Sequence, residues 1–300
     1  MKPNPCYRLG TFRLAYLLAK ILPRSAAQAL AGLIGRAGYA FSKGPRAALR
    51  ENLRHVSGKE GRALDLLCRE NFTNFIKMLA DYFYCISRET TRAKSLVAER
   101  RGDENIKEAF DRGKGVILIT AHLGNWEMGG TLLALRNIPL TVVTLNEPTT
   151  KLTHWRDRYR RRLGIKTVMV GSDTFSFVEM IKTLRNNEGV AMLVDRPYAG
   201  SGTPVLFCGR ETLFSSAPAL LWQHTEATVL PAFVLQNKKG RYLSFAGKAI
   251  EMRKHEDQRK GLAANTQLVA DAFEAIIREH PEQWFNYVPI WKNLEKPGNE

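Results

Sequence analysis

Residues 115–127 read Gly-Val-Ile-Leu-Ile-Thr-Ala-His-Leu-Gly-Asn-Trp-Glu, and this stretch decides the fold class. The run 116–119 is short, apolar and mostly β-branched, which is typical of a strand that is buried on both faces. His122 and a Gly-Asn pair follow it, and Asn125 is a suitable N-cap for a helix that begins immediately afterwards. A buried strand, a turn and a helix in this order predict one unit of an α/β layer.

The same alternation of strand and helix continues along the chain. Further short apolar runs occupy 140–143, 167–170, 190–194 and 229–233, and helix-length segments lie between them at about 126–136, 150–163, 174–187 and 216–226. Another strand is expected at 242–250 and a closing helix at 262–279, whereas about 46–110 is expected to be helical. The sequence therefore predicts an α/β fold with a mostly parallel central sheet flanked by helices.

The N-terminus is predicted to be a helical, membrane-associated region at 1–45 that precedes an α/β domain at 46–300. One face of its first helix is apolar and another is basic. The apolar positions are Leu14, Leu17, Leu18 and Ile21, and the basic ones are Arg13, Lys20 and Arg24. No uncharged run approaches the roughly 18 residues that a spanning helix needs. This favours a helix that lies in the membrane interface, with packing on the protein's own core as the alternative.

Composition narrows the class of partner. The chain has 300 residues, with 45 Lys and Arg against 29 Asp and Glu and a net charge of +16. This charge favours an anionic partner, which could be a phospholipid surface, a nucleic acid or an acidic carrier protein. The four cysteines are scattered without metal-ligand or redox spacing, so we expect reduced thiols, no metal site and no cofactor. They are Cys6, Cys68, Cys85 and Cys208.

His122 is the candidate general base. If the Gly-Asn turn brings Glu127 back to His122, the carboxylate fixes the imidazole tautomer and leaves the second ring nitrogen free to accept a proton from a hydroxyl. A base positioned in this way typically contributes about 10²–10⁴-fold to the rate. A histidine with only a structural role is the alternative interpretation.

The sequence His-Leu-Gly-Asn-Trp-Glu at 122–127 resembles the His-x4-Glu signature of the lipid A biosynthesis acyltransferase family, lauroyl or myristoyl type, within the lysophospholipid acyltransferase superfamily. The resemblance extends through most of the chain. It implies an O-acyltransferase at the cytoplasmic face of the inner membrane, with His122 as base and Glu127 as its partner. The implied donor is an acyl carrier protein or coenzyme A thioester, and the implied acceptor is a hydroxyl of a lipid or glycolipid such as a lipid A precursor.

Candidate substrate-binding residues come first from a basic helix. Five arginines lie within 156–162, and guanidinium groups suit the phosphates of coenzyme A, a phosphopantetheine arm or a lipid headgroup. The spacing of Arg160 and Gly164 is similar to a second conserved block of the family, so Arg160 is the first candidate and Arg158 the second. A solvated basic face is the alternative.

Asp195 and Arg196 follow the strand at 190–194, where they are expected to project into a cleft beside His122. An ion pair between the two that only fixes the loop is the alternative interpretation. Asn125 and Arg210 complete the set of candidate substrate-binding residues.

The acceptor is the least determined part of this interpretation. Enzymes that act on lipid A usually carry a His-Arg-Arg type cluster near the C-terminus, and the segment 281–291 lacks it. The same chemistry on another glycolipid, a lysophospholipid or a polyene lipid is therefore an alternative. A non-catalytic basic protein that binds membranes or nucleic acid is an alternative of another class, although no nucleic-acid-binding motif is present and no such partner is expected.

Overall fold

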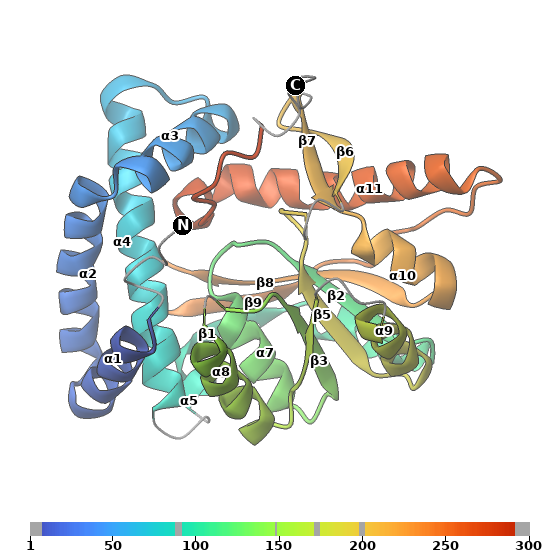
Figure 1. The fold of residues 1–300 in the computed structure, drawn as a ribbon, viewed down its shortest axis with the longest axis horizontal. Coiled ribbons are helices and arrows are strands. Elements are labelled where there is room, and N and C mark those ends of the chain that lie inside the picture. The colour runs from blue at the N-terminus through green and yellow to red at the C-terminus, as the bar shows by residue number, and fades with distance from the viewer. Residues whose placement is uncertain (1–7, 88–91, 148, 171–174, 198–201, 292–300) are drawn as a thin grey trace.

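A seven-stranded sheet lies at the centre of the molecule (Figure 1) in the order β1-β9-β8-β2-β5-β3-β4. The computed structural model describes residues 8–87, 92–147, 149–170, 175–197 and 202–291. The strands of this sheet are β1 (Val97–Arg101), β2 (Val116–Thr120), β3 (Leu140–Thr144), β4 (Lys166–Met169), β5 (Gly189–Leu193), β8 (Thr228–Gln236) and β9 (Tyr242–Ala246). Each apolar run identified in the sequence forms one of them.

The core of the sheet is parallel, as predicted. The central strand β2 pairs in parallel with β5 and β8, and β3 pairs in parallel with β4 and β5. At one side of the sheet β9 runs antiparallel to its neighbour β8, and β1 then pairs in parallel with β9. Because the carboxyl ends of β2 and β5 meet at one edge, the segments that follow them lie next to each other.

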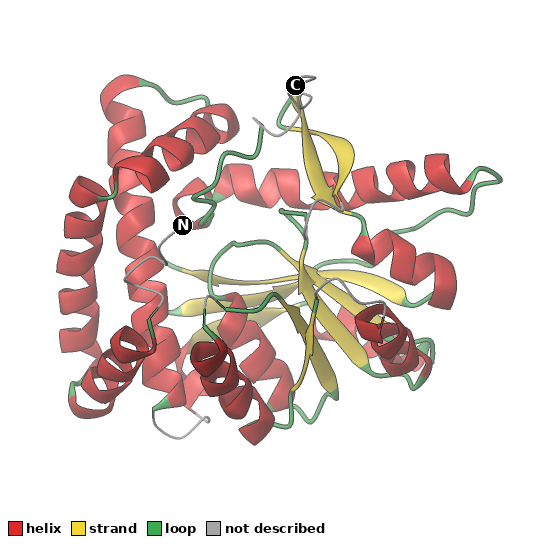
Figure 2. Ribbon diagram, in the orientation of Figure 1, coloured by secondary structure: helices red, strands yellow, loops and turns green. Residues whose placement is uncertain are grey.

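Helices cover both faces of the sheet (Figure 2). Against one face pack α6 and α7, and against the other pack α9, α10 and α11. The bounds of the helices after the N-terminal region are α5 (Arg92–Leu96), α6 (Asp103–Asp111), α7 (Trp126–Ala134), α8 (Thr150–Arg162), α9 (Phe175–Arg185), α10 (Ala217–Thr225) and α11 (Gln258–Glu279), followed by a 3₁₀ turn at Pro281–Gln283. The fold is therefore mixed α/β with a mostly parallel sheet.

The N-terminal region consists of the helices α1 (Leu9–Ile21), α2 (Arg24–Phe41), α3 (Lys43–Ser57) and α4 (Gly61–Ile86). Phe12 and Ala19 of α1 are buried, so one side of this helix packs on the protein, as the alternative interpretation required. The opposite side of α1 exposes Leu14, Leu17 and Ile21 by 58%, 52% and 76%. Among the described residues, no helix combines the length and the apolar character needed to cross a bilayer.

Two elements were not expected from the sequence. The edge strand β1 is almost wholly exposed and carries three charged residues in five, so it lacks an apolar pattern. The second is a hairpin of β6 (Gly202–Phe207) and β7 (Arg210–Ser215), which packs on α11. Its two-residue turn places Cys208 and Gly209 at φ values of 54° and 77°, as a type I′ turn requires.

Candidate active site

His122 and Asp195 meet at the carboxyl ends of β2 and β5. The register of the two strands pairs Thr120 with Leu193. His122 follows Thr120 by two positions, and Asp195 follows Leu193 by two positions. The His122 Nδ1 atom is 2.7 Å from Asp195 Oδ1, and the backbone N–H of His122 donates to the same oxygen at 3.1 Å. The sheet itself therefore assembles a histidine–carboxylate pair.

The predicted pairing of His122 with Glu127 is wrong. Glu127 lies in the first turn of α7, where its carboxylate accepts hydrogen bonds from Arg156 and, at 3.0 Å, from Arg160 of α8. The two guanidinium groups lower the pKa of the Glu127 carboxyl against the effect of burial, which alone would raise it. The Glu127 carboxylate is thus directed to the two arginines of α8, and Asp195 lies beside the imidazole.

The surroundings of Asp195 favour its ionised form. Its side chain is buried, and Trp284 Nε1 donates to Oδ2 at 2.9 Å. Burial alone would raise the pKa of Asp195, but His122, Arg196 and the indole hydrogen bond together lower it to about 2. The indole and the imidazole thus hold the two oxygens of one carboxylate.

The surroundings of His122 favour its neutral form. Burial and the nearby positive charge of Arg196 lower the pKa of His122 below its usual value, and they outweigh the opposing effect of Asp195. With Nδ1 committed to the carboxylate, Nε2 is the ring nitrogen that can accept a proton. The side chain keeps 22% of its surface exposed, so part of the imidazole is open to solvent.

The loop that carries His122 is fixed by its backbone. Gly124 has a φ of +61°, and a Cβ atom there would lie 2.2 Å from the carbonyl oxygen of Val234. The Gly124 N–H donates to Gln283 O at 2.9 Å, and the Phe285 N–H donates to His122 O at 2.6 Å. The C-terminal segment therefore covers this loop and holds it in place.

Asn125 has the structural role of an N-cap. Its side-chain oxygen accepts from the backbone N–H of Met128 at 3.0 Å, and its own N–H donates to Val234 O at 2.7 Å. The side chain is fully buried, so it stabilises the start of α7 and does not face a substrate.

The other candidate substrate-binding residues are dispersed. Arg158 is exposed on α8, whereas Arg160 is buried in its ion pair with Glu127. Arg196 lies beside the pair and donates to Phe285 O at 3.0 Å. Arg210 lies at the start of β7 and contacts His55 Nε2 at 3.0 Å. Of these arginines, Arg196 is the one that the fold brings to His122 and Asp195.

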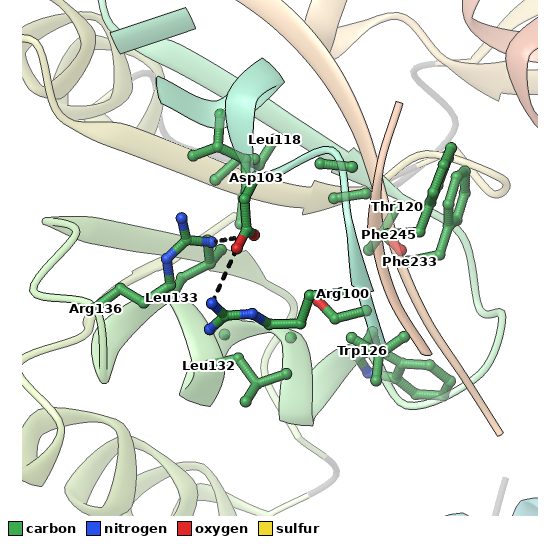
Figure 3. A pocket seen from close by; sticks show the side chains of 18 of the residues that line it. Arg100, Asp103, Leu118, Thr120, Trp126, Leu132, Leu133, Arg136, Phe233 and Phe245 are labelled. Atoms are coloured by element: carbon green, nitrogen blue, oxygen red, sulfur yellow. Dashed lines mark hydrogen bonds and ion pairs between the residues drawn. The ribbon is translucent and has the colours of Figure 1, made fainter. Parts of the chain in front are cut away.

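A largely apolar cavity of about 80 Å³, partly open to solvent, lies between α7 and the sheet (Figure 3). Small residues on both walls create it, namely Gly129 on α7 and Ala191, Ala232 and Ser244 on the sheet. Trp126 lines the cavity, and its ring centroid is 5.5 Å from that of His122. Trp126 thus lies between the cavity and His122.

The family model for bacterial lipid A biosynthesis acyltransferases matches residues 9–293. The chain belongs to this family. The acyltransferase is also similar to a phosphatidylinositol mannoside acyltransferase of Mycolicibacterium smegmatis, with 28% identity over 91% of this chain and 88% of the relative. A protein of the same name from Mycobacterium tuberculosis is 28% identical over 84% of this chain and 79% of its own length. The predicted family and the predicted O-acyltransferase activity are confirmed.

Sequence reasoning missed two residues of the acyltransferase site. Trp284, which holds Asp195, was not among the candidate site residues, and Arg156 was not separated from the other arginines of α8. The signal for Asp195 as the partner of His122 was present, because both residues follow buried strands by two positions. No local signal indicated Trp284, since it reaches the site from the C-terminal segment, 89 positions after Asp195.

Proposed function

We propose that this acyltransferase moves a fatty acyl group from a thioester to a hydroxyl of a glycolipid other than a lipid A precursor, with His122 as general base and Asp195 as its partner. The observation that carries the proposal is the ionised Asp195 on Nδ1 of a neutral His122 beside an apolar cavity. The names of the two relatives and the missing His-Arg-Arg cluster support the choice of acceptor over a lipid A precursor.

The reaction proceeds in one addition and one elimination. As the acceptor oxygen attacks the thioester carbonyl, its proton passes to His122 Nε2, and Asp195 stabilises the imidazolium that forms. The C–O bond is then complete and the carbonyl oxygen carries the negative charge. Collapse of this intermediate breaks the C–S bond, and the leaving thiolate takes the proton from the imidazolium. The enzyme returns to its starting state without a cofactor and without a covalent intermediate.

The acyl donor is an acyl carrier protein or coenzyme A thioester in this proposal. The acyl chain enters the cavity past Trp126, which places the thioester carbon near His122. Arg158 is the exposed cation of α8 among the predicted contacts, and a donor phosphate is its proposed ligand.

The enzyme works at the cytoplasmic face of the inner membrane in this proposal, bound peripherally to anionic lipid. Apolar side chains project from α1 and α2 into solvent, including Ile21, Leu33 and Phe41 at 76%, 62% and 84% exposure. The net charge of +16 adds attraction to anionic headgroups.

The test replaces His122 by glutamine and measures acyl transfer in vesicles that contain phosphatidylinositol mannoside or, separately, a lipid A precursor. We expect the His122→Gln enzyme to lose about 10²–10⁴-fold in rate because it lacks a base. His154, an exposed histidine of α8, supplies the matched control, and His154→Gln is expected to keep full activity. Unchanged transfer by His122→Gln rules out the assigned base, and preference for the lipid A precursor rules out the proposed acceptor.

A further inference from the structure

Three charged side chains that line the cavity bind one another, and in Figure 3 their charged groups lie away from Trp126. Asp103, the first residue of α6, binds Arg136 Nη1 through Oδ1 at 2.7 Å and Arg100 Nη2 through Oδ2 at 3.1 Å. All three side chains line the cavity, and Figure 3 shows the two ion pairs that join them. Arg100, Asp103 and Arg136 are called the Asp103 triad below.

The triad lies one helix length from the histidine pair. Trp126 begins α7, and Arg136 follows the last turn of the same helix. Nine helical residues rise by about 13 Å, so a chain that enters at Trp126 and follows α7 reaches the triad after roughly that distance. Leu118 and Leu132 lie along this path and keep it apolar.

The change from apolar to charged lining alters what each added carbon gains. A methylene that moves from water into the apolar part of the cavity improves binding about fourfold, equivalent to about 0.8 kcal/mol. A methylene that reaches the triad must pack against charged groups or separate them, and so it gains nothing. Carbons beyond the triad therefore add no further binding affinity.

The ion pairs of the triad are expected to contribute little to the stability of the fold. The side chains of Arg100, Asp103 and Arg136 are 49%, 35% and 28% exposed. Ion pairs with this much solvent contact contribute little to stability, so their placement at the end of a cavity calls for another explanation.

We propose that the Asp103 triad sets the upper limit of acyl chain length. The proposal rests on the proposed function, in which the cavity holds the acyl chain of the donor. Within that function it assigns chain-length specificity to residues that are separate from His122 and Asp195.

The test measures binding of saturated fatty acids, graded in steps of two carbons, by displacement of a fluorescent fatty acid from the full-length enzyme. For the native protein we expect affinity to rise with chain length and then to level off. Arg136→Ala removes one side of the end wall, so the limit moves at least one step upward and the next longer chain binds about 15-fold more tightly. Ala232→Leu fills the cavity and moves the limit downward.

Arg161→Ala is the matched control, because it also removes one arginine but from an exposed ion pair with Asp157. Its chain-length profile should equal that of the native enzyme. Arg100→Ala serves as the second test variant if Arg136→Ala does not fold, and its limit also moves upward.

An unchanged chain-length limit in the folded triad variants overturns the proposal, as does an equal loss of affinity for all chains. Absence of fatty acid binding by the native enzyme overturns it as well. Because binding is measured without an acceptor, the same profile in His122→Gln separates the two proposals. A graded profile without acyl transfer by the native enzyme contradicts the proposed function, whereas transfer without an effect of the triad contradicts only the chain-length assignment.

Discussion

His122 lies between two charges of opposite sign that follow one another on the loop after β5. Asp195 stabilises the imidazolium and raises the pKa of His122, whereas burial and Arg196 lower it. The balance keeps the imidazole neutral at physiological pH, which is the form that accepts a proton. Two adjacent residues therefore shift the pKa of one base in opposite directions.

The activity of the enzyme should depend on pH through this balance. Below the pKa of His122 the base is protonated, so kcat/KM rises with pH and its acidic limb lies below the usual histidine pKa of about 6.5. Asp195→Asn removes the charge that raises the pKa, so the limb moves to lower pH while the plateau falls about 10²-fold or more. Arg196→Gln removes a charge that lowers the pKa, so the limb moves to higher pH.

The measurement is kcat/KM against pH for the native enzyme and both variants, with Arg161→Ala as the control for loss of an exposed arginine. Shifts in the same direction for Asp195→Asn and Arg196→Gln would contradict the assignment of both charges. An unshifted limb in both variants would mean that a group other than His122 controls the profile.

At the residue scale, the sequence identifies the members of the site better than their contacts. His122, Asp195 and Arg196 were all selected because they follow buried strands. The partner of His122 was misassigned because the local turn allows Glu127 to approach, while the competing contacts come from Arg156 and Arg160 on another helix. Whether Glu127 or Asp195 contacts His122 depends on the order of the strands in the sheet. Strand order is a long-range property that the spacing of residues along the sequence does not reveal.

The turn between β2 and α7 is the element that presents His122. It carries Gly124 in the left-handed region, against the carbonyl oxygen of Val234, and continues into Asn125, which caps α7. On the other side of the turn, the backbone of Phe285 holds His122. The loop therefore has little freedom to move the imidazole away from Asp195.

Gly124→Ala should damage both stability and activity. The new Cβ atom would overlap the Val234 carbonyl oxygen, and alanine disfavours the left-handed backbone, so we expect a loss of at least about 2 kcal/mol in the free energy of unfolding. Gly113 provides the control, because it has a φ of +73° but no atom within 4 Å of the added Cβ. Gly113→Ala carries only the backbone strain, of about 1 kcal/mol.

Urea unfolding of both variants measures the difference, and acyl transfer by Gly124→Ala measures the effect on the site. Equal destabilisation by the two substitutions would show that the contact with Val234 carries no cost. Native activity in Gly124→Ala would show that the loop position is not needed for catalysis.

At the element scale, hydrophobic pattern predicted the central strands because they are buried on both faces, as β2 is along 116–119. It failed for β1, whose exposed charged residues form a strand only because β9 offers an edge for pairing. The β6–β7 hairpin was missed because Cys-Gly is an unusual sequence for a type I′ turn. Elements that depend on a partner rather than on their own pattern were the ones not foreseen.

In the whole molecule, the N-terminal helices are joined to the sheet by a partly buried ion pair. Arg24 at the start of α2 binds both oxygens of Asp81 in α4 at 2.7 Å, and Tyr242 of β9 donates to the same carboxylate at 2.7 Å. Trp155 of α8 adds an edge-to-face contact with Phe12 of α1, with ring centroids 5.9 Å apart. The buried face of α1 thus contacts α8, the helix whose arginines bind Glu127.

The exposed face of α1 predicts that this helix contacts the membrane. The α1 helix buries Phe12 and Ala19 against the protein but exposes Leu17 and Ile21 by 52% and 76%. Insertion of Leu17 and Ile21 into a bilayer would therefore add favourable free energy of burial. Each contributes about 1.5 kcal/mol or more when it leaves water, and Leu17→Asp with Ile21→Asp should weaken binding to anionic vesicles about 100-fold or more.

Vesicle sedimentation at low and high salt measures the partition of the native enzyme and of the double variant. Added salt should weaken binding of both proteins, because the net charge of +16 contributes attraction that salt screens. Leu66→Asp, at a site 55% exposed on α4 and outside the α1 and α2 surface, is the control and should bind as the native enzyme does. If the double variant binds equally well, the exposed face of α1 is not the membrane contact, and attachment must come from charge or from another surface.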